Sequence, residues 1–380
     1  MADRVLLLGT GKGAFLLEGD SARRDWQLRG PFCDGWPVSH VIGCAATGQI
    51  WAAAGDEWHG SGVWRSADGG ETWQLARLAN GQFDEWLAND PELAAETGLK
   101  PSPPAPYTGR LEALWSLCRA GTSLFAGGKP GLLFASADDG DSWQLVDALA
   151  THPSRESWQP GGAGLVLHSI LAAPEPGDAP RRLWVGISAA GVFASEDGGT
   201  SWERRNRRSN ADAGGGGEVG HCVHGFVRAA EADGDLLYQQ NHHGVFRSPD
   251  GGRSWEEITA GLPSGFGFAI AAHPRDPLTV WVLPHNGDMA GRYPPDAAAA
   301  VWRTRDGGAS WEALRDGLPG RDCYFTVLRQ AMATDAATPA GVYFGTSTGS
   351  VFASHDEGAH WSEIARHLPA IRSVETLAPA

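Results

Sequence analysis

Short runs in which apolar and polar residues alternate, separated by glycine-rich turns, extend along the whole chain. A typical unit reads GLVLHSILAA, RLWVGI and GVFAS, and then ends in a turn that is followed by a tryptophan. Short alternating runs rich in β-branched and aromatic residues, bounded by turn residues, are typical of strands. The pattern therefore predicts an all-β protein built from repeated units of four strands, here named A to D.

Each unit ends in the same turn, Ser/Thr-x-Asp-x-Gly-x-x-Trp. Six copies are SADGGETW (66–73), SADDGDSW (136–143), SEDGGTSW (195–202), SPDGGRSW (248–255), TRDGGASW (304–311) and SHDEGAHW (354–361). A degenerate seventh, GDSARRDW (19–26), keeps the tryptophan, and successive tryptophans are 47 to 70 residues apart. Repeats of about 40–50 residues made of short strands indicate the blades of a propeller.

The turn motif resembles the Asp-box of the bacterial neuraminidase repeat, which sialidases, sortilin-type receptors, xyloglucanases and photosystem II assembly factors share. Its Ser/Thr and Asp side chains suit bonds to local backbone N–H groups, and its glycines suit positive φ. The resemblance implies a β-propeller with the motif at the periphery of each blade. It does not indicate what the protein binds.

The order of the strands predicts how the ring closes. The chain begins with a B-C-D set at 5–28 and ends with a lone A strand at 371–377, which we expect to complete the first blade and remove the open edge. The expected A strands lie at 38–45, 111–119, 165–172, 222–229, 266–272, 323–330 and 371–377. We predict one domain over residues 1–380, a single seven-bladed β-propeller closed by the C-terminal strand.

Composition narrows the classes of partner. Glycine is abundant at 52 residues, only 20% of residues are charged, and the formal net charge is −15. A strongly acidic chain whose basic runs are too short to override that charge is not expected to bind nucleic acid or an anionic membrane. Five cysteines without a CxxC pair argue against a disulfide framework. We expect a cytoplasmic protein, and the pattern leaves its oligomeric state open.

Connections from D to A and from B to C lie on one face of a propeller, so we expect a binding site there. The long ones are 76–109, with a short helix around 83–98, then 147–164, 203–220 and 284–300. Aligning the A strands places His40, His168 and His224 at one level with Trp115. Three imidazoles that converge are typical ligands of Zn, Fe, Cu or Mn, so these histidines are the predicted metal ligands. The alternative is a polar channel lining without a metal.

Other residues on this face, around the opening of the central channel (the channel mouth), are predicted to bind substrate or to take part in catalysis. The predicted substrate-binding residues are Lys12, Trp58, Trp115, Lys129, His242, Phe268 and His285. The predicted catalytic residues are Glu57, His243, Asp322 and Tyr324. Arg329, by contrast, is expected late in an A strand, towards the opposite face.

The favoured function is an enzyme that acts on a small organic molecule, by metal-assisted hydrolase, lyase or oxygenase chemistry. One alternative is a glycosidase of the sialidase kind, although the chain has no RIP motif. Its carboxylates would come from Asp56, Glu57, Glu112 and Asp322. The other alternative is a non-catalytic scaffold that resembles the photosystem assembly factors and binds a partner protein.

Overall fold

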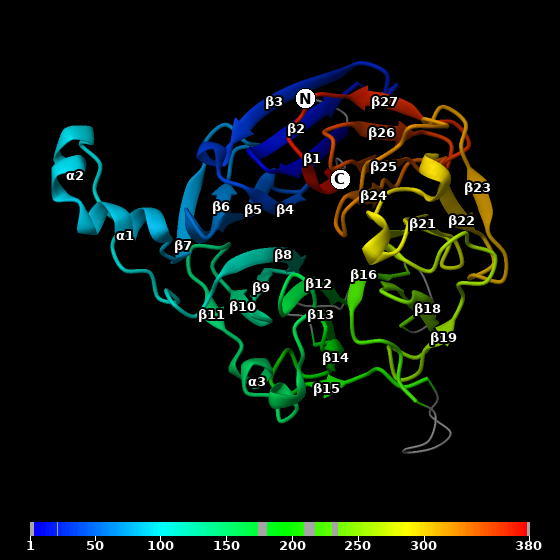
Figure 1. Ribbon diagram of the computed structural model, residues 1–380, viewed down its shortest axis with the longest axis horizontal. Coiled ribbons are helices and arrows are strands. Elements are labelled where there is room, and N and C mark those ends of the chain that lie inside the picture. The colour runs from blue at the N-terminus through cyan, green and yellow to red at the C-terminus, as the bar shows by residue number, and fades with distance from the viewer. Residues whose placement is uncertain (1–3, 21, 174–180, 209–216, 230–234, 378–380) are drawn as a thin grey trace.

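The computed structural model describes residues 4–20, 22–173, 181–208, 217–229 and 235–377. In this part of the chain, seven four-stranded antiparallel sheets stand around a ring (Figure 1). The first three, each given from the inner strand outwards, are β28 (Ile371–Leu377), β1 (Arg4–Thr10), β2 (Gly13–Gly19) and β3 (Trp26–Phe32); β4 (Val38–Cys44), β5 (Gln49–Asp56), β6 (Gly60–Ser66) and β7 (Gln74–Ala79); and β8 (Ala113–Ala120), β9 (Ser123–Lys129), β10 (Leu132–Ser136) and β11 (Gln144–Leu145).

The remaining four sheets follow in chain order. They are β12 (Val166–Ala172), β13 (Leu183–Ser188), β14 (Gly191–Ser195) and β15 (Glu203–Arg204); β16 (Val223–Arg228), β17 (Leu237–Asn241), β18 (Gly244–Ser248) and β19 (Glu256–Glu257); β20 (Gly267–Ala272), β21 (Val280–Pro284), β22 (Val301–Thr304) and β23 (Glu312–Leu314); and β24 (Met332–Thr334), β25 (Val342–Gly345), β26 (Val351–Ser354) and β27 (Ser362–Ala365). The prediction of an all-β seven-bladed propeller is confirmed.

The C-terminal strand closes the ring as the sequence predicts. β28 pairs antiparallel with β1, with Val374 opposite Leu8 and Leu377 opposite Val5. In Figure 1 the red end of the chain accordingly lies beside the blue end. Because β28 is the inner strand of a blade, it is covered by neighbours, and Ile371 and Val374 are fully buried.

The Asp-box turns are closed by side chains. At 136–143, Ser136 Oγ accepts the N–H of Gly140 at 2.9 Å, and Asp138 accepts both the N–H and the hydroxyl of Ser142 at 2.9 and 2.6 Å. The bonds from Ser142 lower the pKa of Asp138 to about 2. Trp143 is buried against the turn, and its indole N–H donates to Gly140 O at 3.1 Å. The serine and aspartate side chains thus supply the hydrogen bonds that close the turn between the third and fourth strands of the blade.

Tryptophans in the second strand of a blade join it to the turn of another blade. Trp51 on β5 donates to Asp139 O at 2.8 Å, and Trp184 on β13 donates to Gly251 O at 3.0 Å. Both indole rings are fully buried. Each ring therefore removes a large apolar area from water and still satisfies its N–H group, which holds neighbouring sheets at a set distance.

One predicted strand is wrong. Residues 323–330 are not a strand, and the inner strand of that blade begins at Met332. The backbone N–H of Val327 donates instead to His285 Nε2 at 3.0 Å, and that of Thr326 donates to Ser347 Oγ at 2.9 Å. The alternating pattern of CYFTVLRQ resembles a strand, but these N–H groups are satisfied by side chains.

The helices are few and short in the described residues. α1 (Gln82–Asn89) and α2 (Pro91–Thr97) project from the ring and confirm the helix expected around 83–98 (Figure 1). The others are α3 (Asp147–Ala150) and the 3₁₀ turns η1 (Cys33–Gly35), η2 (Arg155–Ser157), η3 (Asp288–Ala290) and η4 (Pro295–Ala297). None of the helices in the described ranges has the length and apolarity needed to span a membrane.

Ending the chain after Ala370 removes β28 and leaves β1 as an open inner edge. We expect the melting temperature to fall by at least about 10 °C, because several buried side chains and one whole strand ladder are lost. Thermal unfolding followed by circular dichroism measures this. A chain ended after Leu377 is the control, and equal melting temperatures for the two truncations would contradict the prediction.

Candidate functional site

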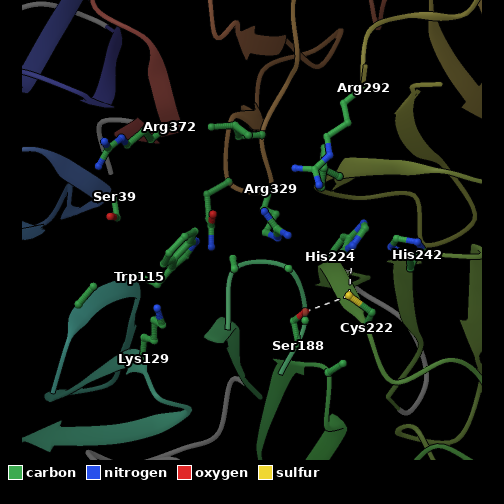
Figure 2. Close-up of a pocket in the computed structure, with 18 of the residues that line it drawn as sticks. Ser39, Trp115, Lys129, Ser188, Cys222, His224, His242, Arg292, Arg329 and Arg372 are labelled. Carbon is green, nitrogen blue, oxygen red and sulfur yellow. Dashed lines mark hydrogen bonds between the residues drawn. The ribbon is translucent and has the colours of Figure 1, made fainter. Parts of the chain in front are cut away.

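A pocket of about 1110 Å³ opens where the inner strands begin. Its wall comes from the connections that lead into inner strands and from those between second and third strands, the face on which the sequence places the site. Figure 2 shows side chains from several blades around this cavity. The pocket is large enough for a small organic ligand, since sites of about 300–1,000 Å³ are usual for such molecules.

A β-bulge recurs at the start of the inner strands. In six sheets the pairing between the inner strand and its neighbour shifts by one residue within its first few positions, leaving one extra residue. Five of the extra residues are Ser39, Trp115, His168, His224 and Arg372, and in β20 Phe268 and Ala269 share the place opposite one residue of β21. Of these, Ser39, Trp115, His224, Phe268 and Arg372 line the pocket. Bulges re-aim a side chain, so five of these six blades supply a pocket position from the bulge.

The bulges correct the predicted register of the first histidine. The residue equivalent to Trp115 and His224 is Ser39, not His40. A shift by one residue moves a side chain to the other face of a sheet. His40 accordingly lies between blades, where its Nδ1 accepts the N–H of Leu117 at 2.9 Å and its Nε2 lies 3.2 Å from Glu375.

His168 is also outside the group of ligands that the structure assembles. It is fully buried, with its ring 5.5 Å from that of Trp115, and neither ring nitrogen has a hydrogen-bond partner in the described part of the chain. Burial, and then the charge of Arg329, hold the pKa of His168 well below its ordinary value. The predicted trio of His40, His168 and His224 is thus not brought together.

The structure forms a different group around His224. Cys222, His224 and His242 place one ligand atom each within 4.8 Å of one another, and among the described residues this is the only such set of His, Cys, Asp and Glu. Cys222 Sγ lies 3.4 Å from His224 Nε2, and the two imidazole rings are 5.3 Å apart. The backbone N–H of His242 donates to Cys222 O at 3.0 Å, which ties the β17–β18 turn to the start of β16.

The surroundings set the tautomer of His224. Its Nδ1 lies 2.7 Å from the carbonyl oxygen of Gly267, which only accepts, so Nδ1 carries the hydrogen and Nε2 keeps a lone pair towards Cys222. Burial, followed by the charge of Arg329, lowers the pKa of His224 to about 3. Burial also lowers the pKa of His242. Both imidazoles are therefore neutral at pH 7 and able to bind a metal.

Some residues predicted for substrate or catalysis share this pocket, and others do not. Glu57, Trp115, Lys129, His242, His243 and Phe268 line it. Asp322 and Tyr324 instead lie in a second depression beside Gly317 and Phe325. Lys12 is exposed outside the lining, and Trp58 packs against Phe83 of α1 with the ring centres 5.5 Å apart. His285 is fully buried, where it accepts the N–H of Val327.

Two kinds of pocket residue escape the sequence argument. Cys222 was passed over because no CxxC pair is present, yet the spacing Cys222-x-His224 at a strand start is a signal for ligands on one face. Arg292, Arg329 and Arg372 also line the pocket. Arg329 is the clearest correction, because the segment that carries it is not a strand and so does not take it to the opposite face.

Comparisons with known proteins reveal likeness in structure only. No family profile and no curated protein sequence matches the chain. A GH74 xyloglucanase from Xanthomonas campestris superposes on 96% of this chain and 53% of its own, with a TM-score of 0.62 and 17% identity. A GH74 enzyme from Niastella koreensis covers 99% of this chain and 52% of its own, with a TM-score of 0.60 and 14% identity.

YCF48 bound to a D1 peptide superposes on 87% of this chain and 82% of its own, with a TM-score of 0.52 and 14% identity. The chain thus spans about half the length of the two GH74 structures and most of YCF48. At this identity the likeness establishes the class of fold, a seven-bladed β-propeller, and nothing about activity.

His285 generates a prediction for stability and pH. His285→Leu leaves the Val327 N–H without its acceptor, so at pH 7 we expect the free energy of unfolding to fall by about 1–3 kcal/mol. Burial lowers the pKa of His285 from 6.5 to about 3. Between these two pH values only the unfolded wild type binds this proton, which costs the wild type about 1.4 kcal/mol per pH unit.

The difference between wild type and His285→Leu should therefore shrink as the pH falls from 6.5 towards 4. Urea unfolding at pH 7, 5.5 and 4 measures it, with the exposed His367→Asn variant as the control. A difference that stays constant over this range would show that His285 titrates normally.

Proposed function

We propose that the protein is an enzyme that hydrolyses a small organic molecule in the channel-mouth pocket, assisted by a metal ion held by Cys222, His224 and His242. The observation that carries the proposal is the convergence of their three ligand atoms within 4.8 Å on the wall of that pocket. A small-molecule partner, rather than nucleic acid or a membrane, belongs to the proposal and agrees with the net charge of −15. A cytoplasmic location is also part of the proposal, in keeping with five cysteines that form no CxxC pair.

The donor set and its spacing fit zinc. With Zn–S near 2.3 Å and Zn–N near 2.0–2.1 Å, tetrahedral geometry separates sulfur and nitrogen by about 3.5 Å. Cys222 Sγ and His224 Nε2 are 3.4 Å apart. The hydroxyl of Ser188 lies 2.9 Å from Cys222 Sγ and can donate to a thiolate. One sulfur and two imidazole ligands leave a coordination position open, as in catalytic sites.

A bound metal of this kind supplies a Lewis acid and an activated water. The chain itself offers His243 for moving a proton beside it, and Glu57 lines the same pocket from the β5–β6 turn of another blade. Glu57 is positioned by Gln82, whose side-chain amide donates to Glu57 Oε1 at 2.5 Å. His243 follows His242 directly, so the ligand turn also carries a candidate general base.

The glycosidase alternative uses carboxylates of the same pocket. Glu57 and Glu112 both line it, and the likeness to GH74 enzymes is in keeping with such chemistry. However, Glu112 is held by Lys129 at 2.8 Å and Glu57 by Gln82. Asp322, a further candidate, lies in the second depression. These contacts favour the Cys–His–His group as the reactive centre.

The scaffold alternative draws on YCF48, whose structure contains a D1 peptide. A protein-binding face has no need of three side chains that can bind a metal on a cavity wall, whereas a metal-dependent enzyme does. The two proposals are separated by metal content and by hydrolytic activity.

Neighbouring histidines provide a matched test of the metal site. Purified without a polyhistidine tag, the wild type should contain about one zinc per chain, as elemental analysis measures. His242→Ala should lose it, because two ligands hold zinc weakly, while His243→Ala should retain it. Cys222→Ser should also lose the metal.

Zinc should raise the stability of the stripped wild type by about 2.7 kcal/mol at a free concentration one hundred times the Kd. The same zinc addition should leave His242→Ala unchanged. If the wild type holds no transition metal and none raises its melting temperature, metal-assisted catalysis is excluded.

A further inference from the structure

Arg329 enters the pocket without an ion-pair or hydrogen-bond partner in the described part of the chain. Its Nε is sealed from solvent with no hydrogen bond, and among the described residues no ion pair or hydrogen bond of its guanidinium is found. In Figure 2 the side chain lies near the middle of the cavity, between Trp115 and His224. A partly buried cation without a counter-charge is unfavourable unless something else supplies the negative charge.

A second guanidinium faces the same region. The Cζ atoms of Arg329 and Arg292 lie 4.7 and 5.9 Å from the centre of the Phe268 ring. Burial lowers the pKa of Arg329 to about 10, nearby Cys222 opposes this shift, and the charge of Arg292 adds to it. Two guanidinium groups therefore contact one aromatic ring, and Arg329 remains protonated at pH 7.

Arg372 contributes a third cation from the bulge of β28. Burial lowers the pKa of Arg372, and the charge of Asp56 opposes that shift. No ion pair joins these two side chains in the described structure. The Asp56 carboxylate is instead occupied by His59, through its backbone N–H and its imidazole, each at 2.8 Å.

The other carboxylates of the wall are also engaged. The pairs are Asp56 with His59, Glu57 with Gln82, Glu112 with Lys129, and Asp288 with Arg292. Each of these carboxylates thus has a partner, whereas Arg329 and Arg372 form no ion pair among the described residues. This occurs in a chain whose formal net charge is −15, so the excess of positive charge is local to the pocket.

We propose that Arg329, supported by Arg292, binds the oxyanion group of the substrate, a carboxylate or a phosphate. The guanidinium fork matches both groups bidentately, and Phe268 keeps two of these forks in place. The substrate class is therefore a small anionic organic molecule rather than a neutral saccharide. The naming of a substrate rests on the proposed function, whereas the anion site itself does not depend on a metal.

The position of Arg329 would also hold a bound anion beside the proposed metal ligands Cys222, His224 and His242. Arg329 is close enough to Cys222 and His224 for the charges to affect one another. A substrate held by its oxyanion at Arg329 would present its remaining atoms to the Cys222–His224–His242 wall. A neutral molecule of the same shape would leave the arginines unpaired and bind more weakly.

Anion binding is measured by isothermal titration with inorganic phosphate and, separately, with acetate, at constant ionic strength set by sodium chloride. We expect saturable binding of at least one probe, and the arm that binds more tightly distinguishes phosphate from carboxylate. Arg329→Gln should weaken binding at least about 30-fold. The matched control is Arg366→Gln, an exposed arginine near Glu363, which should bind as the wild type does.

A second readout guards against loss of folding. Arg329 makes no ion pair or hydrogen bond in the described structure, and its burial near the charge of Arg292 outweighs its contact with Phe268. Arg329→Gln without anion should therefore melt at or above the wild-type temperature. Phosphate or acetate should then raise the melting temperature of the wild type more than that of the variant. A variant that melts well below the wild type would show that Arg329 is paired within the protein, and would overturn the proposal.

Absence of binding of both probes to the folded wild type, or equal binding by Arg329→Gln, would also overturn it. Two variants test the metal site and the anion site independently. Cys222→Ser should lose zinc and keep its affinity for the anion, while Arg329→Gln should keep zinc. Loss of anion binding in Cys222→Ser would show that the anion binds to the metal rather than to the arginine.

Discussion

The pairing of β28 with β1 is the contact on which the rest of the structure depends. A propeller whose ring stays open exposes the backbone groups of two inner strands and separates blades that bury their side chains against each other. Here the antiparallel ladder runs from Val5 opposite Leu377 to Thr10 opposite Ile371. The same ladder contains the bulge that directs Arg372 into the pocket, so closure of the ring and completion of the site are one event.

The pocket follows from a local irregularity that is repeated around the ring. An ideal strand would send alternate side chains to the two faces of its blade, and none would be aimed along the channel mouth. One extra residue at the start of an inner strand changes that direction in six blades. Residues as far apart as Ser39 and Arg372 thereby face one cavity (Figure 2). Soft metal ligands on one side and unpaired arginines nearby give this cavity two chemically different halves.

Periodicity was sufficient for the fold. The spacing of the Asp-box turns predicted the blades, and the surplus A strand at 371–377 predicted the closure, because both depend on local turn chemistry and on the strand period. The histidines of the mouth were recognised, and His224 and His242 do lie in the pocket. The strand predicted at 323–330 was wrong, because whether an alternating segment forms a ladder depends on which acceptors face its N–H groups.

What the sequence determined by itself is the repeat: seven units, their turns, and the face on which histidines gather. Which side chains meet was decided only by the tertiary structure. A bulge moves every following residue by one position, so Ser39 and not His40 reaches the pocket. The contact of Cys222 and His224 with His242 depends on a hairpin that folds back over the start of β16. Likewise, Arg329 reaches the pocket from a segment that forms no strand, in which an imidazole buried in another blade accepts the N–H of Val327, and no local pattern encodes that acceptor.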